Sequence, residues 1–378
     1  MKKIRVLIVS GNMDVGGIEN QLMHLLRNAD KEKFQIDFTT NMEHPFYEEE
    51  ILSLGGRCIR ICNTEGKHFF KYCKELYNVL HGNYDVVHSH ELFHSGLVLL
   101  TAKLAGIKSR IVHAHNISDA DENDAHSSIV RKIYNWVMRK LILGCATQFC
   151  ACSSPAGEFL YGKEISKKEN YNLIFNSIDV SKFMSSKEND NCDNCDDWVN
   201  VLQVGRFTEV KNQLFSVEIA NEFKKANKKI RILCVGNNGN DYEQSVRNKI
   251  NEYDVSEYIQ LLGVRRDVPD IMARCDAFLL PSLYEGMPLV LLEAQTAGLN
   301  CVVADTFSHE VDFGIGSINW LSLESGAKAW AGKIADAVKS EPANKATIMN
   351  AVKKYGFDSI SFCEKVCRVY ENDYNRFI

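Results

Sequence analysis

The sequence predicts an α/β protein with two Rossmann-like lobes. Two observations support this: short apolar runs alternate with longer segments of helical spacing, and the alternation stops at a polar stretch and then restarts. Continuous short apolar runs are typical of strands that are buried on both faces of a parallel sheet. We therefore expect two open parallel sheets that face each other across an interdomain cleft. Ligands of such sheets bind outside the carboxyl ends of the strands.

Each expected strand is followed by turn residues or by a stretch with helical spacing. In the first lobe we expect strands at Ile4–Ser10, Phe34–Thr40, Asp85–Ser89, Arg110–Ala114, Thr147–Ala151 and Asn172–Phe175. In the second lobe we expect them at Trp198–Gly205, Arg231–Gly236, Ile259–Gly263, Ala277–Pro281 and Cys301–Asp305.

The polar stretch 181–200 contains Ser, Asn, Asp and Lys with almost no apolar periodicity, so we expect it to be a linker. It divides a first lobe, residues 1–180, from a second lobe, residues 201–356. Residues 357–378 are expected to form a terminal helix that returns to the first lobe. Its apolar residues at helical spacing are Ile360, Cys363, Val366, Cys367 and Tyr370.

Composition excludes several classes of protein. The 378 residues carry a net charge of −5, which gives no reason to expect a nucleic-acid partner. No run approaches the ~18 apolar residues of a membrane span, and the run ending at Ser10 is too short for a signal peptide. We therefore expect a cytoplasmic protein, with peripheral attachment to the inner face of the plasma membrane as an open possibility.

Thirteen cysteines are many for this length. Cysteines within apolar runs are expected to be reduced thiols of the core, and they are Cys145, Cys150, Cys152, Cys234 and Cys301. Cys192 and Cys195 form a C-x-x-C pair, but no second pair follows at a suitable spacing for a structural zinc site. We interpret this pair as part of a solvated linker.

The loop after the first strand carries a glycine pair, Gly16 and Gly17. It lacks the dinucleotide fingerprint G-x-G-x-x-G, and Gly17 occupies the place where a phosphate-binding P-loop needs lysine. Backbone amides at a strand-to-helix junction can approach a ligand closely. A tight turn without a ligand is an equally good interpretation of this pair alone.

Two basic residues follow the first strand of the second lobe. Arg206 comes directly after Val204-Gly205, and Lys211 follows five residues later. A guanidinium and an ammonium at the mouth of a parallel sheet can together neutralise a diphosphate. The alternative is an ordinary solvated loop.

Two glutamates flank the start of a later helix. Glu285 precedes Gly286-Met287-Pro288-Leu289, and proline favours the first position of a helix. The amides of this segment are expected to face the ligand. Glu293 lies in an apolar stretch, where a carboxylate is costly without a partner. The two hydroxyls of a ribose would provide one.

These motifs together resemble the family-4 retaining glycosyltransferases of the GT-B fold. The resemblance rests on Glu285-x7-Glu293, on Arg206 with Lys211, and on Gly16-Gly17-Ile18-Glu19, and it runs nearly end to end. The segments Leu262–Pro269 and Leu289–Gly298 are most similar to the branch that builds capsular and exopolysaccharide repeat units.

The resemblance implies that residues 1–180 form the acceptor-side lobe and that residues 201–356 form the nucleotide-sugar-binding lobe. It also implies roles for the donor-site residues. Arg206 and Lys211 would contact the donor diphosphate, Glu293 the ribose, and Glu285 the transferred sugar. Gly17 would approach the phosphates from the opposite lobe, and Gly16 is assigned to the acceptor side. The remaining donor-side residues implied by the match are Gly263, Val264, Arg265, Gly286, Met287, Pro288 and Leu289.

The resemblance also assigns catalytic roles to His115 and Glu285. His115 ends a strand of the first lobe. Asn116 stands where many relatives have glycine. We expect His113 to point away from the face that His115 occupies, and we assign His90 to the acceptor side. The reaction is expected to need no metal or other cofactor and no protein nucleophile. Asp119 and Asp121 spell D-x-D, which we interpret as part of an acidic loop.

The implied partners are a nucleotide sugar, in this branch a UDP-sugar, and an oligosaccharide linked to polyprenyl diphosphate. The segment 126–145 carries Arg131, Lys132, Arg139 and Lys140 and no acidic residue, with Trp136 on one stripe. It is expected either to hold the inner membrane face or to pack as a core helix. A UDP-sugar 2-epimerase of similar fold and a non-catalytic nucleotide-sugar-binding subunit are the alternatives to transfer. The missing fingerprint disfavours a dinucleotide oxidoreductase.

Overall fold

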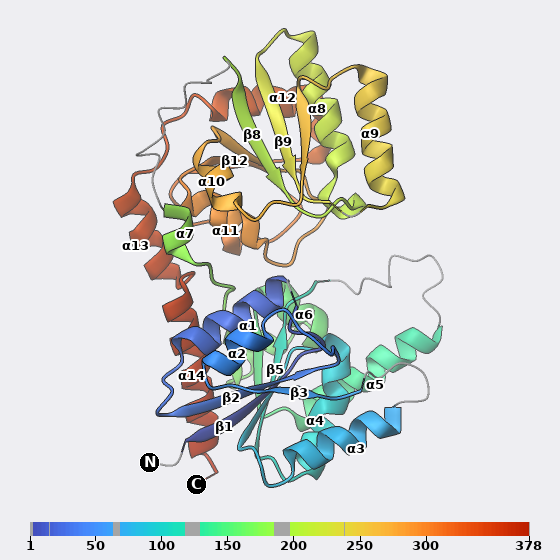
Figure 1. The fold of residues 1–378 in the computed structure, drawn as a ribbon, viewed down its shortest axis with the longest axis vertical. Coiled ribbons are helices and arrows are strands. Elements are labelled where there is room, and N and C mark those ends of the chain that lie inside the picture. The colour runs from blue at the N-terminus through green and yellow to red at the C-terminus, as the bar shows by residue number, and fades with distance from the viewer. Residues whose placement is uncertain are drawn as a thin grey trace. The chain divides into compact units, whose positions relative to one another are not determined.

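The computed structural model describes residues 3–14, 16–62, 69–117, 129–184, 197–237 and 239–377. The chain forms two compact units (Figure 1). The first contains Met1–Ser177 together with Ser359–Ile378, and the second contains Ile178–Asp358. The chain therefore leaves the first unit and comes back to it.

The first unit is built on a seven-stranded sheet with the order β3-β2-β1-β4-β5-β6-β7, and all its pairs are parallel. Its strands are β1 (Ile4–Val9), β2 (Phe34–Thr40), β3 (Cys58–Arg60), β4 (Val86–Ser89), β5 (Ser109–Ala114), β6 (Gln148–Ala151) and β7 (Tyr171–Leu173). Val6, Leu7, Ile8 and Val9 of the inner strand β1 are all buried, as the continuous apolar run predicts.

Helices connect these strands and cover the sheet. They are α1 (Gly17–Asn28), α2 (Glu48–Ser53), α3 (Phe69–Leu80), α4 (Ser95–Leu104), α5 (Ile129–Cys145), α6 (Ser154–Tyr161) and the returning helix α14 (Ser359–Asn375). α1 packs against α14, and the apolar stripes of both helices share one core with β1 and β2. α4 packs between α3 and α5.

The returning helix α14 lies along the first unit and packs against α1 (Figure 1). Buried polar contacts and its apolar stripe fix it there. The carboxylate of Asp373 is fully buried and accepts hydrogen bonds from Ser109 Oγ at 2.6 Å and from Gln148 Nε2 at 3.0 Å. A buried carboxylate is tolerated where hydrogen bonds satisfy it. Ile360, which was expected in the apolar stripe, is exposed, and Phe362, which was not expected there, is buried.

The second unit repeats the architecture with a six-stranded parallel sheet of order β10-β9-β8-β11-β12-β13. Its strands are β8 (Val199–Val204), β9 (Ile230–Val235), β10 (Ile259–Gly263), β11 (Ala277–Leu280), β12 (Asn300–Ala304) and β13 (Ile318–Leu321). Its helices are α7 (Val180–Met184), α8 (Gln213–Lys225), α9 (Asp241–Tyr253), α10 (Val268–Ala273), α11 (Leu289–Thr296), α12 (Gly326–Ala337) and α13 (Lys345–Tyr355).

The second unit begins before the expected linker of residues 181–200. The short helix α7 lies partly within the residues assigned to the linker, and it packs against α10 and α11 of the second unit. Its five residues are too few to show apolar periodicity in the sequence. Most of the remaining linker, with Cys192 and Cys195, lies outside the described residues.

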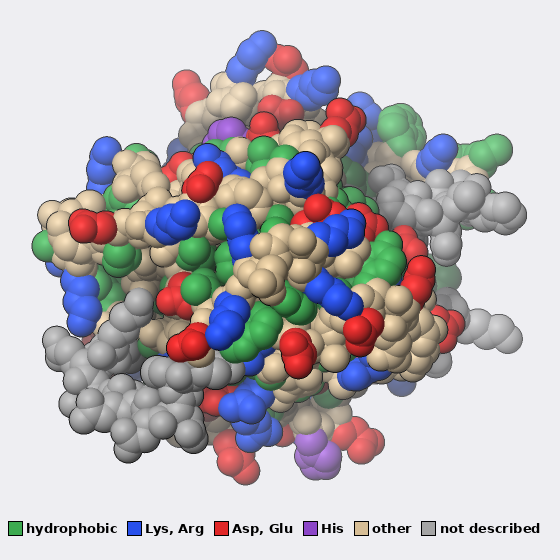
Figure 2. All heavy atoms as spheres, turned by 90° about the horizontal axis from the view of Figure 1, so that it is seen from above, with side chains coloured by type: hydrophobic (Ala, Val, Ile, Leu, Met, Phe, Trp, Pro, Cys, Tyr) green, Lys and Arg blue, Asp and Glu red, His purple; other side chains and the backbone are tan. Residues whose placement is uncertain are grey.

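Several composition-based predictions can be checked on the structure. The thiols expected in the core are buried and free of disulfide bonds, which confirms that prediction. Figure 2 shows basic and acidic side chains interspersed over one face of the molecule. In the part of the chain that the structure describes, no helix has the length and apolar character needed to cross a bilayer.

Candidate active site

The carboxyl ends of the neighbouring strands β8 and β11 bring together one group of predicted residues in the second unit. Arg206 follows β8, Lys211 ends the short 3-10 helix η5 (Glu209–Lys211), and Glu285 follows β11. The two loops are joined by a backbone hydrogen bond from Leu283 N to Val210 O at 2.8 Å. Because β8 and β11 pair in parallel, both loops leave the same edge of the sheet.

Lys211 and Glu285 form an ion pair. Nζ of Lys211 lies 2.5 Å from Oε1 of Glu285, and the two side chains are only 21% and 12% exposed. The methylene chain of Lys211 lies over Gly205, where an added Cβ would stand 3.2 Å from it. Arg206, in contrast, is exposed, and none of its side-chain nitrogens bonds to a described residue. The group therefore offers one unpaired guanidinium and one ammonium shared with a carboxylate.

Glu293 lies in the second turn of α11. The residue is half-buried. This burial raises the pKa of Glu293 to about 7, and the nearby charge of Lys182 counteracts part of the effect. Among the described residues, nothing donates a hydrogen bond to this carboxyl group. A buried acceptor without a partner is suited to a ligand that brings hydroxyl groups.

The helix α11 begins at Leu289, directly after Pro288, and no side chain caps its first turn. Its unpaired amides therefore remain available to an anion or a hydroxyl group. Met287 and Pro288 are buried, and Pro288 has no backbone N–H to donate. Gly286 and Leu289 are half-buried.

The residues at the end of β10 are arranged differently. Gly263 adopts a positive φ of 68°, and Val264 after it is exposed. Arg265 is paired with Asp267, with its guanidinium nitrogens 2.5 and 2.7 Å from the carboxylate. Because β10 is an edge strand separated from β8 by β9, these residues do not join the Lys211 group.

Gly236, at the end of β9, is a position that the sequence argument missed. It has a φ of 133°, and an added Cβ would lie 2.0 Å from the carbonyl oxygen of Gly205. Only glycine allows the ends of β8 and β9 to approach this closely. The signal was present in the sequence, since a glycine directly follows β8 and β9 and ends β10: Gly205, Gly236 and Gly263.

In the first unit, the glycine pair lies at a helix start, as expected for a strand-to-helix junction. α1 begins at Gly17, and Gly16 precedes it in an extended conformation. The side chain of Glu19 folds back over Gly16, where an added Cβ would stand 2.1 Å from Oε2. Partial burial raises the pKa of Glu19 above its ordinary value.

Four histidines form a row on one face of the first sheet, at the ends of β4 and β5. His88 pairs in register with Ile111, so His90 lies beside His113 and His115 follows. His90 Nδ1 and His115 Nε2 are 2.8 Å apart, and His88 Nδ1 is 2.8 Å from the hydroxyl group of Tyr370. Burial lowers the pKa of every one of these histidines, that of His115 to about 4, so they are neutral imidazoles near pH 7.

The expectation that His113 points away from His115 is wrong. The two rings are stacked, with centroids 4.4 Å apart and an interplanar angle of 20°. Side chains alternate along a strand with a period of two, so residues 113 and 115 must share a face. His90 and His115, assigned to the acceptor side and to catalysis, are brought into direct contact.

The histidine row raises the question of a metal. Ligand nitrogens of His88, His90 and His113 lie within 4.8 Å of one another, which makes them a candidate group within the described ranges. However, His88 and His113 are stacked with an interplanar angle of 16°. Imidazole lone pairs lie in the ring plane, so stacked rings do not direct them at one ion. Asp119 and Asp121 lie outside the described residues.

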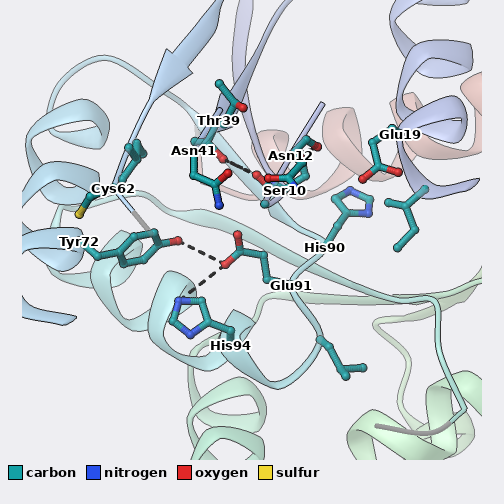
Figure 3. Close-up of a pocket in the computed structure, with 15 residues that line it drawn as sticks. Ser10, Asn12, Glu19, Thr39, Asn41, Cys62, Tyr72, His90, Glu91 and His94 are labelled. Carbon is teal, nitrogen blue, oxygen red and sulfur yellow. Dashed lines mark hydrogen bonds and ion pairs between the residues drawn. The ribbon is translucent and has the colours of Figure 1, made fainter. Parts of the chain in front are cut away.

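A pocket of about 440 Å³ lies beside His90 in the first unit (Figure 3). Glu91, which the sequence argument did not single out, is at its centre. Its Oε2 accepts a hydrogen bond from the Tyr72 hydroxyl group at 3.3 Å and lies 3.7 Å from His94 Nε2. Burial raises the pKa of Glu91 to about 7. The signal available in the sequence was a carboxylate directly after the strand-end sequence His88-Ser89-His90.

The helix α5 does not match either sequence interpretation completely. Its buried side carries Asn135, Met138, Ile142 and Cys145, whereas its outward side carries Ile129, Val130, Ile133, Trp136 and Val137. Lys132 and Lys140 are exposed. Arg139 instead turns inward and donates to the carbonyl oxygens of Phe159 and Leu160 at 2.7 and 3.0 Å. The exposed surface is therefore more apolar and less basic than expected.

Two family descriptions match the chain: "Glycosyl transferases group 1" over residues 196–354 and "Glycosyltransferase Family 4" over residues 15–182. The chain is 32% identical to the glycosyltransferase EpsF of Bacillus subtilis (strain 168), with 98% of both chains covered. It is 30% identical to the capsular polysaccharide biosynthesis glycosyltransferase CapH of Staphylococcus aureus, with 79% of this chain and 80% of CapH covered. It is 31% identical to an Escherichia coli UDP-Gal:alpha-D-GlcNAc-diphosphoundecaprenol alpha-1,3-galactosyltransferase, with 59% of this chain and 58% of that enzyme covered.

Solved structures show the same fold. Anabaena HepE, determined in complex with UDP and glucose, matches with a TM-score of 0.77 at 15% identity, covering 97% of this chain and 99% of HepE. A glycosyltransferase from Rickettsia africae matches with a TM-score of 0.77 at 15% identity, covering 99% of both chains. The prediction of a two-lobed GT-B fold is confirmed.

Proposed function

The chain belongs to the group 1 and family 4 glycosyltransferases, and from this premise we propose the reaction that it catalyses. It transfers a hexose-type sugar from a nucleotide diphosphate sugar to a growing, lipid-linked oligosaccharide of a bacterial capsule or exopolysaccharide, with retention at the anomeric carbon. UDP is the favoured nucleotide, because HepE was crystallised with UDP and the E. coli relative is named for UDP-Gal. CapH is named as a capsular polysaccharide biosynthesis glycosyltransferase, which supports the polysaccharide role.

The observation that carries the proposal is the group formed by Arg206, Lys211, Glu285 and Glu293 at one edge of the second sheet. Departure of the nucleoside diphosphate leaves positive charge on the sugar and negative charge on the phosphates. The exposed guanidinium of Arg206, the ammonium of Lys211 and the uncapped amides of α11 can stabilise that negative charge. We therefore expect no metal to be required.

The two glutamates have different proposed roles. Glu293 accepts hydrogen bonds from the ribose hydroxyls, which supply the partner that its buried carboxyl group lacks. Glu285, held by Lys211 at 2.5 Å, positions the transferred sugar. Because Lys211 contacts both Glu285 and, in this proposal, the diphosphate, it links the two parts of the donor.

For the first unit we propose His115 as a catalytic residue, with His90 and Gly16 on the acceptor side. Its pKa near 4 makes His115 a neutral hydrogen-bonding group rather than a cation at the pH of the cytoplasm. In a front-face mechanism the acceptor hydroxyl group attacks the sugar from the side that the diphosphate leaves. Such a mechanism needs no protein nucleophile, since the leaving phosphate assists deprotonation of the acceptor hydroxyl group.

We further propose that α5 rests on the inner membrane face, where a lipid-linked acceptor is found. Trp136 is 60% exposed and Ile129 76% exposed, and Lys140 lies 5.8 Å from the Trp136 ring. An exposed apolar stripe with flanking lysines is typical of a helix at a lipid interface. The E. coli relative, and a Campylobacter jejuni relative that is 28% identical, are named for undecaprenol-linked acceptors.

The test of the proposed function is thermal stabilisation by a panel of UDP, GDP, ADP and their sugar conjugates. A ligand at 100 times its dissociation constant raises the stability of the native state by about 2.7 kcal/mol. UDP and at least one UDP-sugar should raise the unfolding temperature, and Arg206→Ala should lose most of the shift. A panel without any response would contradict the proposal, and stabilisation by NAD alone, measured beside the panel, would replace it.

A further inference from the structure

The pocket beside His90 has a lining without any positive charge among the residues described. Its carboxylates are Glu19 and Glu91, and its imidazoles are His90 and His94. Burial lowers the pKa of His94 to about 4 and that of His90 well below its ordinary value, so both rings are neutral. The remaining polar lining consists of hydroxyl and amide groups, on Ser10, Asn12, Thr39, Thr40, Asn41 and Tyr72, and of the Cys62 thiol.

Glu91 is held so that one of its oxygens remains available. Oε2 accepts a hydrogen bond from the Tyr72 hydroxyl group and lies near Nε2 of His94. Nδ1 of His94 is in turn hydrogen-bonded to the hydroxyl group of Tyr134 at 3.1 Å. Oε1 has no hydrogen-bond partner among the described residues. Figure 3 shows Glu91 between Tyr72 and His94 on one side and Asn12 and Asn41 on the other. The side chain is only 16% exposed. The carboxylate is thus fixed from behind and open toward the pocket.

We propose that this pocket binds an uncharged acceptor sugar through its hydroxyl groups and rejects an anionic sugar, and that Glu91 determines this selectivity. The inference rests on the proposed transfer reaction, because it names the class of acceptor. A volume of about 440 Å³ is within the range of small-molecule sites and accommodates a sugar ring.

The selectivity follows from charge and hydrogen bonding. Sugar hydroxyls can donate to Glu91 Oε1 and exchange hydrogen bonds with Asn12 and Asn41. A uronic acid places a second carboxylate beside Glu91, in a site where no described cation neutralises either group. Burying an unpaired charge beside a like charge is strongly unfavourable. Rejection by a repulsive group is a common basis of specificity.

Tyr134 connects this pocket with α5. Its hydroxyl group bonds to His94 from the inner side of the helix, whose outer side carries the exposed Trp136 and Ile133. An acceptor whose lipid lies along the outer side of α5 would have its sugar near a pocket that the same helix supports. The diphosphate of such an acceptor must then bind outside this pocket, since the described lining offers it no cation.

The test compares matched neutral and anionic sugars at pH 8, where Glu91 carries its charge. Glucose, galactose and mannose are each compared with their own uronic acid, both as short-chain prenyl diphosphate acceptors and as methyl glycosides. Transfer is measured as kcat/KM, and binding of the methyl glycosides by saturation-transfer NMR. For the best sugar, wild type should prefer the neutral form by about 30-fold or more.

In Glu91→Gln, the preference should fall to within about threefold, because the repulsive charge is gone. Tyr72→Phe keeps the carboxylate and should keep the preference, even where acceptor binding weakens. Glu49→Gln, at an exposed position of α2, is the matched control and should change neither quantity. Circular dichroism and UDP-induced stabilisation verify that each variant is folded.

Equal use of the uronic acids by wild type would overturn the inference, as would an unchanged preference in Glu91→Gln. A protein that binds none of the neutral methyl glycosides would overturn the sugar pocket itself. Failure of the proposed function has a different signature, which is the loss of any response to nucleotide sugars.

Discussion

The ammonium group of Lys211 lies 2.5 Å from the carboxylate of Glu285, and both side chains are largely buried. Two residues that we assign to different parts of the donor, its diphosphate and its sugar, are therefore in direct contact before any donor binds. Removing one of them changes the electrostatic state of the other. This coupling leads to the first prediction.

Lys211→Ala and Arg206→Ala should each weaken UDP binding by about 1.5–3 kcal/mol, because each removes a charge-assisted contact to phosphate. Lys211→Ala should cost more, since it also leaves the Glu285 carboxylate unpaired beside the ligand. In a Glu285→Gln background, the cost of Lys211→Ala should fall by about 0.5–3 kcal/mol. Calorimetric titration of UDP into wild type, Lys211→Ala, Glu285→Gln and the Lys211→Ala/Glu285→Gln double variant checks this. Strictly additive costs would show that the ion pair has no influence on nucleotide binding.

Glu293→Gln and Glu285→Gln should separate binding from turnover. Glu293→Gln should chiefly weaken UDP binding, because the ribose is common to donor and product. Glu285→Gln should chiefly lower kcat, and it should bind UDP at least as tightly as wild type because Lys211 is released toward the phosphates. Dissociation constants for UDP and initial transfer rates measure both effects. Wild-type UDP affinity in Glu293→Gln would remove the ribose assignment.

The raised pKa of Glu293 predicts a pH-dependent contribution to stability. Its pKa is about 7 in the folded chain, against an ordinary value of 4.5. The folded state therefore binds more protons than the unfolded state between these values, and this residue's contribution to stability falls as the pH rises from about 4.5 to 7. At pH 8 Glu293→Gln should be more stable than wild type, by on the order of 1–3 kcal/mol.

The comparison is made by thermal unfolding of wild type and Glu293→Gln at pH 5 and pH 8 without nucleotide. At pH 5 wild-type Glu293 already holds its proton, so the two proteins should have nearly the same unfolding temperature. An equal difference at both pH values would mean that the carboxyl group is not the source of the effect.

His115→Ala should slow transfer and leave UDP affinity unchanged, because His115 belongs to the first unit and the nucleotide residues to the second. Loss of one hydrogen-bonding group that acts in the transition state typically costs about 10²-fold or more in kcat. Asn116→Ala, at the adjacent exposed position, is the control. A variant at His115 with normal kcat would remove it from the catalytic residues.

Metal removal provides a further test. Full activity is expected in excess chelator, since Arg206, Lys211 and the amides of α11 stabilise the negative charge of the phosphates. Activity that disappears with chelator and returns with manganese or magnesium would instead indicate that Asp119 and Asp121, or the histidine row, bind a metal.

Much of the fold could be predicted because most strands are buried on both faces. Phe34–Thr40 and Ile259–Gly263 were predicted with the bounds that the structure has. The strands β3 and β13 were missed because each is a short edge strand without fully buried residues. Such a strand lacks the continuous apolar run on which the prediction depends.

The candidate site could be predicted only where residues follow strand ends at a recognisable spacing. Lys211 and Glu285 were chosen separately, and their contact depends on the pairing of β8 with β11, which a single sequence does not reveal. Glu91 was missed for the same reason, because its partners Tyr72 and His94 come from other elements. The error at His113 was one of reasoning, since its place beside His115 follows from strand geometry alone.

Release of UDP from UDP-sugars, measured over time without acceptor and then with a prenyl-diphosphate-linked sugar, tests the central claim most directly. We predict slow release from at least one UDP-sugar without acceptor, and faster release with acceptor, accompanied by a product heavier by one hexose unit. Arg206→Ala should reduce both rates. Tight binding of UDP-sugars without any release under either condition would contradict the claim and identify a non-catalytic nucleotide-sugar-binding protein.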